Sequence, residues 1–300
     1  MYMLPDYLKK NDKIAIVCPA KKLPKSIEFG IKVIESWGLK VILGETVNAS
    51  HHQFAGDDVL RTRDIQQYLD DNEIKAIIAA RGGYGTIRII DELDFTNFKN
   101  NPKWIVGFSD ITILLSHIYA NFQIPTIHGQ MPMTFDEATP ASLESLRKIL
   151  FGELLEINTD SHQFNKIGSV EGEIIGGNLA LLINIEGSAS EMNFDDKILF
   201  LEDVGEHEYA IDRMMRMLKR AGKLKNLKAL IVGCFNELGE ESIYFGQNPN
   251  EIIKEIVEEY NYPVCFDFPI GHIENNMAIK VGGIAKLNIT KEKVSLIQNF

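Results

Sequence analysis

The chain has 300 residues, of which 45% are hydrophobic and 24% are charged, and this length is sufficient for two domains with separate cores. The formal net charge of −11 argues against nucleic acid as the main partner, because no basic stripe is present to meet phosphates. The three cysteines, at 18, 234 and 265, lie in apolar runs without the spacing of a disulfide framework or a zinc site. No signal-like start and no run of membrane-spanning length is present, so we expect a protein of the reducing cytoplasm.

Strands and helices alternate through the first part of the chain. Apolar runs predict strands at 13–18, 41–43, 74–80, 104–106 and 126–128, and helical periodicity marks helices around 27–34, 65–69 and 111–122. Strands separated by helices favour a parallel sheet with flanking helices, whose ligands lie beyond the carboxyl ends of the strands. We therefore predict an N-terminal α/β domain over residues 1–135.

The second part of the chain has a different pattern. Residues 136–166 contain one expected helix, at 141–150, and a polar stretch that we interpret as a linker. Residues 167–300 are predicted to form a mixed α/β, barrel-like domain. Its expected strands are 170–175, 198–201, 229–232 and 264–268, its helices are near 179–183, 211–218 and 252–260, and a meander follows from 277.

The tetrapeptide 107–110 (GFSD) stands where the apolar run 104–106 gives way to a helical pattern. This order predicts strand, sharp turn and helix, with Ser109 at the turn, as in a nucleophile elbow. The match is partial, because Ile111 occupies the position where a second glycine is usual. In the alternative interpretation, Ser109 only caps the helix and Asp110 favours its positive end.

The segment 81–85 (RGGYG) follows the strand expected at 74–80. Its three glycines leave bare N–H groups and let the backbone approach a ligand closely. Such a turn can hold a phosphate or can form an oxyanion hole beside a serine nucleophile, although its spacing matches neither GxGxxG nor a P-loop. A ligand-free βα turn is the structural alternative. Arg81 is suited to a substrate carboxylate or to a pair with a surface acid.

A serine nucleophile needs a base, and the base needs an orienting acid. Among the seven histidines, His272 stands just past an expected strand end. His128 follows a short strand and can line the same rim as Ser109, at the carboxyl ends of the strands. Glu202 is the candidate acid because it ends an apolar strand, where a carboxylate needs a partner. The alternative for Glu202 is a structural pair with Arg213 or a nearby amide. The other histidines, at 51, 52, 117, 162 and 207, lie in loops, in the linker or on a helix.

Together these motifs resemble the LD-carboxypeptidases of bacterial peptidoglycan recycling and the related microcin-immunity serine peptidases. The resemblance covers nearly the whole chain in order. Two positions depart from the family pattern, since Lys280 and Gln130 stand where proline is usual, and both affect local loop shape. The matching segments are 16–20, 81–85 with Arg88, 107–110, 176–179, 199–203 with 212–213, and 271–272 with Asn276.

The resemblance implies a Ser–His–Glu triad, with Ser109 as nucleophile, His272 as base and Glu202 as orienting acid. The N-terminal domain, residues 1–135, would carry the nucleophile, and the C-terminal domain, residues 167–300, would carry the base and the acid. It further implies an oxyanion hole formed by the backbone amides of Asp110 and Gly83. Neither a metal nor another cofactor is needed for this chemistry.

The family's substrate would be a muropeptide tetrapeptide, from which the terminal D-alanine is released by cleavage of its amide bond to the L-centre of a diamino acid. A cation must then hold the terminal carboxylate, and Arg81 and Arg88 are the candidates, with Tyr84 beside them. The resemblance also implies a homodimer. Two alternatives remain, namely a hydrolase of a peptidyl-nucleotide antibiotic and an inactive peptide-binding module. The first is less favoured because no tryptophan follows Gly177 to stack on a base.

Overall fold

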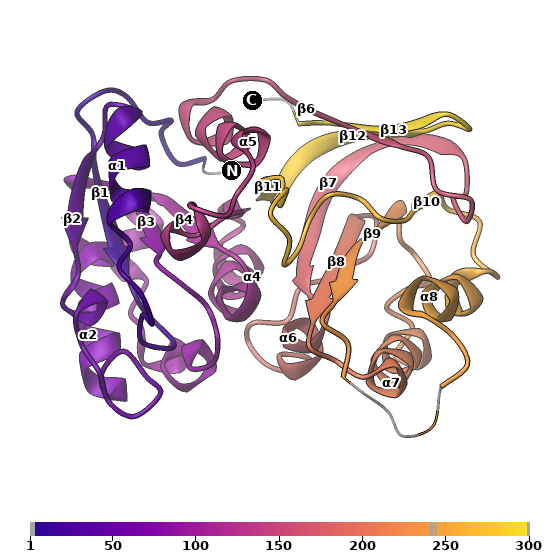
Figure 1. Ribbon diagram of the computed structural model, residues 1–300, viewed down its shortest axis with the longest axis horizontal. Coiled ribbons are helices and arrows are strands. Elements are labelled where there is room, and N and C mark those ends of the chain that lie inside the picture. Colours follow the sequence, from indigo (N-terminus) through magenta and orange to yellow (C-terminus); the bar gives the residue numbers. More distant parts are fainter. Residues whose placement is uncertain (1–3, 240–242, 244, 299–300) are drawn as a thin grey trace.

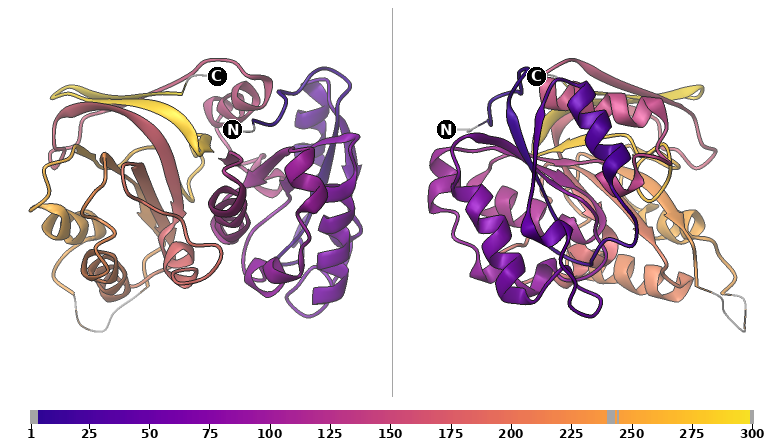
Figure 2. Two further views of the ribbon diagram at one scale, coloured as in Figure 1. Left: turned by 180° about the vertical axis from the view of Figure 1, so that it is seen from behind. Right: turned by 60° about the vertical axis from the view of Figure 1, so that its left-hand side comes forward.

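The computed structural model describes residues 4–239, 243 and 245–298. It contains two sheets that lie in separate lobes, with helix α4 (Thr112–Phe122) and helix α5 (Pro140–Phe151) between them (Figures 1 and 2). The predicted fold class, a parallel sheet with flanking helices followed by a barrel-like mixed domain, is confirmed. Within the part of the chain described, no helix combines the length and the apolarity that crossing a membrane requires.

The first sheet has five parallel strands and one antiparallel edge strand. The parallel strands lie in the spatial order β2 (Lys40–Leu43), β1 (Lys13–Val17), β3 (Ile74–Ala79), β4 (Trp104–Gly107) and β5 (Thr126–His128). The three central strands are almost wholly buried, which explains why each reads as a continuous apolar run. The connecting helices are α1 (Glu28–Ser36), α2 (Asp58–Asp70), α3 (Thr96–Asn100) and α4.

The antiparallel edge strand of the first sheet comes from the far end of the chain. Strand β11 (Ile279–Val281) pairs with β5, and Ile279 lies opposite His128. The second half of the chain therefore completes the first sheet.

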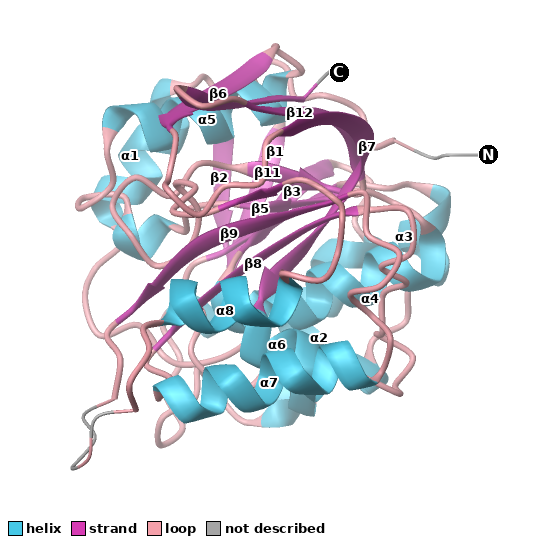
Figure 3. Cartoon of the chain, turned by 90° about the vertical axis from the view of Figure 1, so that its right-hand side faces the viewer, coloured by secondary structure: helices cyan, strands magenta, loops and turns pink. Residues whose placement is uncertain are grey.

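The second sheet has seven strands, and it curls into a half-barrel (Figure 1). Helices α6 (Leu179–Asn184), α7 (Glu208–Arg220) and α8 (Pro249–Val257) lie on one side of β8 and β9 (Figure 3). The order is β10 (Val264–Cys265), β9 (Ala229–Asn236), β8 (Ile198–Val204), β7 (Gly168–Asn178), β12 (Gly283–Ile289), β13 (Lys293–Gln298) and β6 (Leu155–Asp160). The first four are parallel, and the last three pair antiparallel.

Strand β6 corrects the interpretation of residues 136–166 as a linker. It pairs antiparallel with β13 at the edge of the second sheet, so this polar stretch contributes to the fold. Its side chains alternate between buried and exposed positions over Leu155–Asn158, which is the pattern of a strand with one solvated face. The strand expected at 264–268 is also shorter than predicted, since β10 ends at Cys265.

The two sheets meet where α4 approaches the end of β7. The Asn178 backbone N–H donates to Thr112 Oγ1 at 3.2 Å. At Gly177 the backbone has φ +152°, and a Cβ added there would lie 2.6 Å from Thr112 Cγ2. A glycine is therefore required for both the local backbone and the close approach of the helix that follows the Ser109 turn.

We expect Gly177→Ala to destabilise the protein through this contact. Gly187→Ala is the matched control, because Gly187 also has a positive φ, +77°, but an added Cβ would meet nothing within 4 Å. The free energy of unfolding in urea should fall by at least about 1 kcal/mol more in Gly177→Ala than in the control, since overpacking adds to backbone strain. Equal losses in the two variants would contradict the importance of the Thr112 contact.

Candidate active site

Ser109 stands at a sharp turn between β4 and α4. Its φ is +62°, in the left-handed region that non-glycine residues seldom occupy, and a short 3₁₀ turn over Ser109–Ile111 leads into the helix. No side chain caps either this turn or α4, so the alternative of Ser109 as a simple cap is not observed. A Cβ at Gly107 would lie 2.8 Å from Ile111 Cγ2, so the elbow needs this glycine while Ile111 replaces the second one.

The glycine turn lies directly against Ser109. A Cβ added at Gly82 would lie 3.0 Å from Ser109 Cβ and 3.4 Å from the Asp110 nitrogen. The buried Asp110 carboxylate fixes this arrangement, because it accepts the Thr86 N–H at 2.9 Å. A side chain at position 82 would crowd the hydroxyl, and glycine leaves that space open.

Glu202 and His272 form a hydrogen-bonded pair. The carboxylate of Glu202, at the end of β8, is 0% exposed, and its Oε2 lies 2.7 Å from His272 Nδ1. Because an ionised carboxylate only accepts, Nδ1 carries the proton and Nε2 is left to act as a base. Burial lowers the pKa of His272, but the hydrogen bond and charge of Glu202 outweigh burial and leave this pKa above its ordinary value.

The pair and the serine turn meet through Phe108. The Phe108 ring, one residue before Ser109, lies 4.8 Å from the His272 ring, centroid to centroid. The Ser109 hydroxyl makes no hydrogen bond to any residue that the structure describes. Catalytic contacts of this kind commonly tighten only when substrate is bound. The structure thus brings together three segments, namely the end of β4, the end of β8 and the loop after β10.

His128 lies behind the site and not on its rim. It is fully buried, its Nε2 lies 3.3 Å from Asn276 Oδ1, and burial lowers its pKa to about 4. With its Nε2 against the Asn276 amide oxygen and its pKa this low, His128 is a poorer base for the Ser109 hydroxyl than His272. Arg213 is also remote from Glu202, since its guanidinium stacks over the Tyr209 ring at 5.5 Å.

The two predicted carboxylate-binding arginines have partners within the protein. Arg81 donates from Nη1 to the Lys22 carbonyl at 2.7 Å. Arg88 donates from Nε to both carboxylate oxygens of Asp58, at 3.0 Å each. Tyr84 is 45% exposed on the same turn. Both arginines are thus committed to contacts within the protein.

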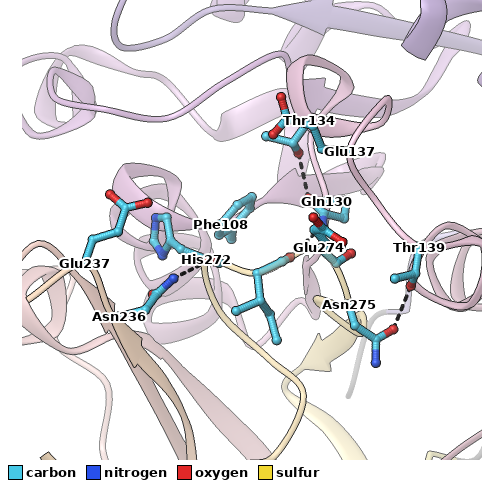
Figure 4. Close-up of a pocket in the computed structure, with 11 residues that line it drawn as sticks. Phe108, Gln130, Thr134, Glu137, Thr139, Asn236, Glu237, His272, Glu274 and Asn275 are labelled. Atoms are coloured by element: carbon cyan, nitrogen blue, oxygen red, sulfur yellow. Dashed lines mark hydrogen bonds between the residues drawn. The ribbon is translucent and has the colours of Figure 1, made fainter.

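A pocket of about 610 Å³ opens beside His272 (Figure 4). Sequence reasoning missed most of its polar residues, which lie in loops, in a 3₁₀ turn and at the end of β9, without a recognisable motif. Gln130 is the exception, because its departure from the family pattern was visible. Its side chain holds the loop after His272 by donating to the Ile273 carbonyl at 3.1 Å. The lining residues are Phe108, Gln130, Thr134, Glu137, Thr139, Asn236, Glu237, His272, Ile273, Glu274 and Asn275.

The second family departure, Lys280, is accommodated inside strand β11. Its backbone N–H and C=O pair with the Gln298 side chain at 2.9 and 3.1 Å. Among the residues described, no group of three or more His, Cys, Asp or Glu side chains could hold a metal ion.

Comparisons with known proteins agree along the whole chain. Residues 14–129 match the LD-carboxypeptidase N-terminal domain, and residues 171–287 match the LD-carboxypeptidase C-terminal domain. A probable murein peptide carboxypeptidase of Bacillus subtilis is 31% identical over 300 residues, which covers 98% of this chain and 94% of the relative.

Solved structures share the fold. The muramoyltetrapeptide carboxypeptidase from Oxalobacter formigenes superposes with a TM-score of 0.86 at 29% identity, covering 96% of this chain and 99% of that one. The microcin C7 self-immunity protein MccF in complex with aspartyl sulfamoyl adenosine gives a TM-score of 0.88 at 22% identity, covering 98% of each chain. At that identity the second likeness establishes the fold alone.

Replacing Glu202 by Gln should lower the pKa of His272, because an amide keeps the shape of the carboxylate without its charge. NMR titration of the imidazole signals measures this decrease directly. Glu237→Gln is the control, since the exposed Glu237 carboxylate raises the same pKa less than Glu202 does. An unchanged pKa in Glu202→Gln would contradict the pairing.

Proposed function

This chain belongs to the LD-carboxypeptidase family, and we propose that it is a serine carboxypeptidase that releases the terminal D-alanine from muropeptide tetrapeptides by hydrolysing an L,D amide bond. The names of the similar murein peptide and muramoyltetrapeptide carboxypeptidases support this substrate class. The observation that carries the proposal is the buried Glu202–His272 pair, which lies against the strained Ser109 turn.

The proposed mechanism assigns one role to each group. His272 Nε2 takes the Ser109 proton as Oγ attacks the scissile carbonyl carbon, while Glu202 holds Nδ1–H and stabilises the imidazolium. Backbone N–H groups of Asp110 and Gly83 stabilise the oxyanion. The imidazolium then gives its proton to the leaving amine, which departs as D-alanine. Water, deprotonated by His272, attacks the acyl-enzyme and releases the shortened peptide with Ser109 regenerated.

Cleavage of a terminal residue requires a site for its carboxylate. Arg81, Arg88 and Tyr84 remain candidates from sequence, although both arginines already have internal partners. The homodimer and the cytoplasmic location expected from the resemblance also remain proposals, which sedimentation and cell fractionation test.

The alternative reaction, hydrolysis of a peptidyl-nucleotide antibiotic, rests on the shared fold with MccF at 22% identity. It is less favoured because no tryptophan follows Gly177 to stack on a nucleobase. The other alternative, an inactive peptide-binding module, predicts no turnover of any tetrapeptide.

Single removal of each triad group should abolish most D-alanine release while the protein stays folded. We expect Ser109→Ala, His272→Ala and Glu202→Gln to lower kcat by roughly three decades or more, with double variants little worse than the worst single one, since the groups act as a unit. Released D-alanine is assayed, and circular dichroism monitors the fold. Ser116→Ala, a buried serine of α4, is the control that should keep its activity. Normal turnover by Ser109→Ala would exclude it as the nucleophile.

The pH profile should report the raised pKa of His272. A base must be neutral, so kcat/KM is full above this pKa and falls as the pH decreases through it. We expect the acid limb to lie above the ordinary histidine value of about 6.5. In Glu202→Gln the limb should move to lower pH while kcat falls. Tryptophan fluorescence over the same range separates titration from unfolding, and a wild-type limb well below 6.5 would exclude His272 in its paired state as the base.

A further inference from the structure

Lys21 lies at the carboxyl end of the first sheet, beyond β1, and its backbone is fixed on both sides. It forms an antiparallel bridge with Phe54, and the neighbouring Lys22 N–H donates to the Gln53 carbonyl at 3.0 Å. Arg81 adds its hydrogen bond to the Lys22 carbonyl. The arginine predicted to bind substrate therefore helps to position the segment that carries Lys21.

The Lys21 side chain lies across the glycine turn beside the nucleophile. At Gly83, where φ is +115°, an added Cβ would lie 2.5 Å from Lys21 Cδ and 2.7 Å from its Cγ. The preceding glycine, Gly82, lies against Ser109. Lys21, the two glycines and Ser109 therefore follow one another along the rim, and the glycines leave room for the lysine stem.

The ammonium of Lys21 has no acidic partner in the part of the chain that the structure describes. Two other basic side chains of the first half do have acidic partners. Arg88 pairs with Asp58, and Lys25 pairs with Asp136 and Glu137. The pocket beside His272 has no lysine or arginine in its lining and contains three glutamates. Glu137 is paired with Lys25, but Glu237 and Glu274 have no basic partner among the described residues. The charges therefore favour a substrate carboxylate on the Lys21 side of Ser109 over this pocket.

We infer that Lys21 Nζ binds the terminal carboxylate of the peptide substrate, which is the role that the sequence suggested for Arg81 and Arg88. The inference rests on the proposed function. The carboxylate carbon of a terminal residue is three bonds from the scissile carbonyl carbon, so the two carbons lie within about 4 Å of each other. The Cα of a lysine that binds this carboxylate must therefore lie within about 4 Å plus the reach of its side chain from the scissile carbon. Contact with Gly83 restricts the stem, which lowers the entropy lost when the ammonium binds.

The test compares a lysine-type tetrapeptide that ends in D-alanine with the same peptide ending in D-alaninamide. In the wild type, amidation should lower kcat/KM by roughly one to three decades. In Lys21→Met, which keeps an unbranched stem, kcat/KM for the free acid should fall by a similar factor and that for the amide should stay within about threefold of wild type. Lys21→Arg should restore part of the preference for the acid.

Lys22→Met is the matched control, because Lys22 is adjacent and exposed, and its ammonium contacts only the Ser50 hydroxyl among the described residues. It should leave both rates unchanged. A wild-type preference for the acid that persists in Lys21→Met would overturn the inference. So would equal losses on acid and amide in Lys21→Met, because Lys21 would then bind another part of the substrate or support the turn.

Binding to the Ser109→Ala protein separates this inference from the proposed function. Calorimetry should show that Ser109→Ala binds the free acid more tightly than the amide, and that adding Lys21→Met removes this difference. This result without wild-type turnover would support the Lys21 site and contradict the peptidase proposal. Turnover by the wild type without a Lys21-dependent difference in binding would support the peptidase and contradict the site.

Discussion

The hydrogen bond between Glu202 and His272 is the interaction on which the rest of the site depends. A carboxylate with 0% exposure is costly unless a partner meets it, so the loop that carries His272 must be held firmly. Hydrogen bonds from the second sheet and within the loop itself hold it in place. Asn236 Nδ2, from β9, donates to the His272 carbonyl at 2.7 Å, and the Gly271 N–H donates to Asn276 Oδ1 at 2.9 Å. The imidazole is thus oriented before any substrate arrives.

The same loop is fixed by the other half of the molecule. Ser142 Oγ, on α5, donates to the Asn276 carbonyl, and Ser145 Oγ accepts the Ala278 N–H at 2.8 Å. On the opposite side Thr112, three residues after Ser109, packs against Gly177. Neither half carries a complete set of reactive groups. The relative position of the two sheets therefore sets the distance between Ser109 and His272, the proposed nucleophile and base.

Sequence patterns predicted the features that depend on residues close together in the chain. Buried parallel strands such as β3 are apolar runs, and Ser109, Glu202 and His272 stand at or near strand ends, so their residue types were visible. Strand β6 was missed because it lies at a sheet edge and four of its six residues are polar or charged. The partners of Arg88 and the position of Lys21 depend on contacts between distant segments, which no local pattern contains.

The pairing of β11 with β5 has a consequence for how the protein folds as it is synthesised. On the ribosome, residues 1–128 emerge early and supply all five parallel strands of the first sheet. The outer edge of β5 nevertheless lacks its neighbour until residues 279–281 have been synthesised. A nascent chain in which the parallel strands have already paired therefore carries an open sheet edge while residues 129–278 are being synthesised. Such an edge is prone to pairing with other chains, so this stage of synthesis is the one at which misassembly is favoured.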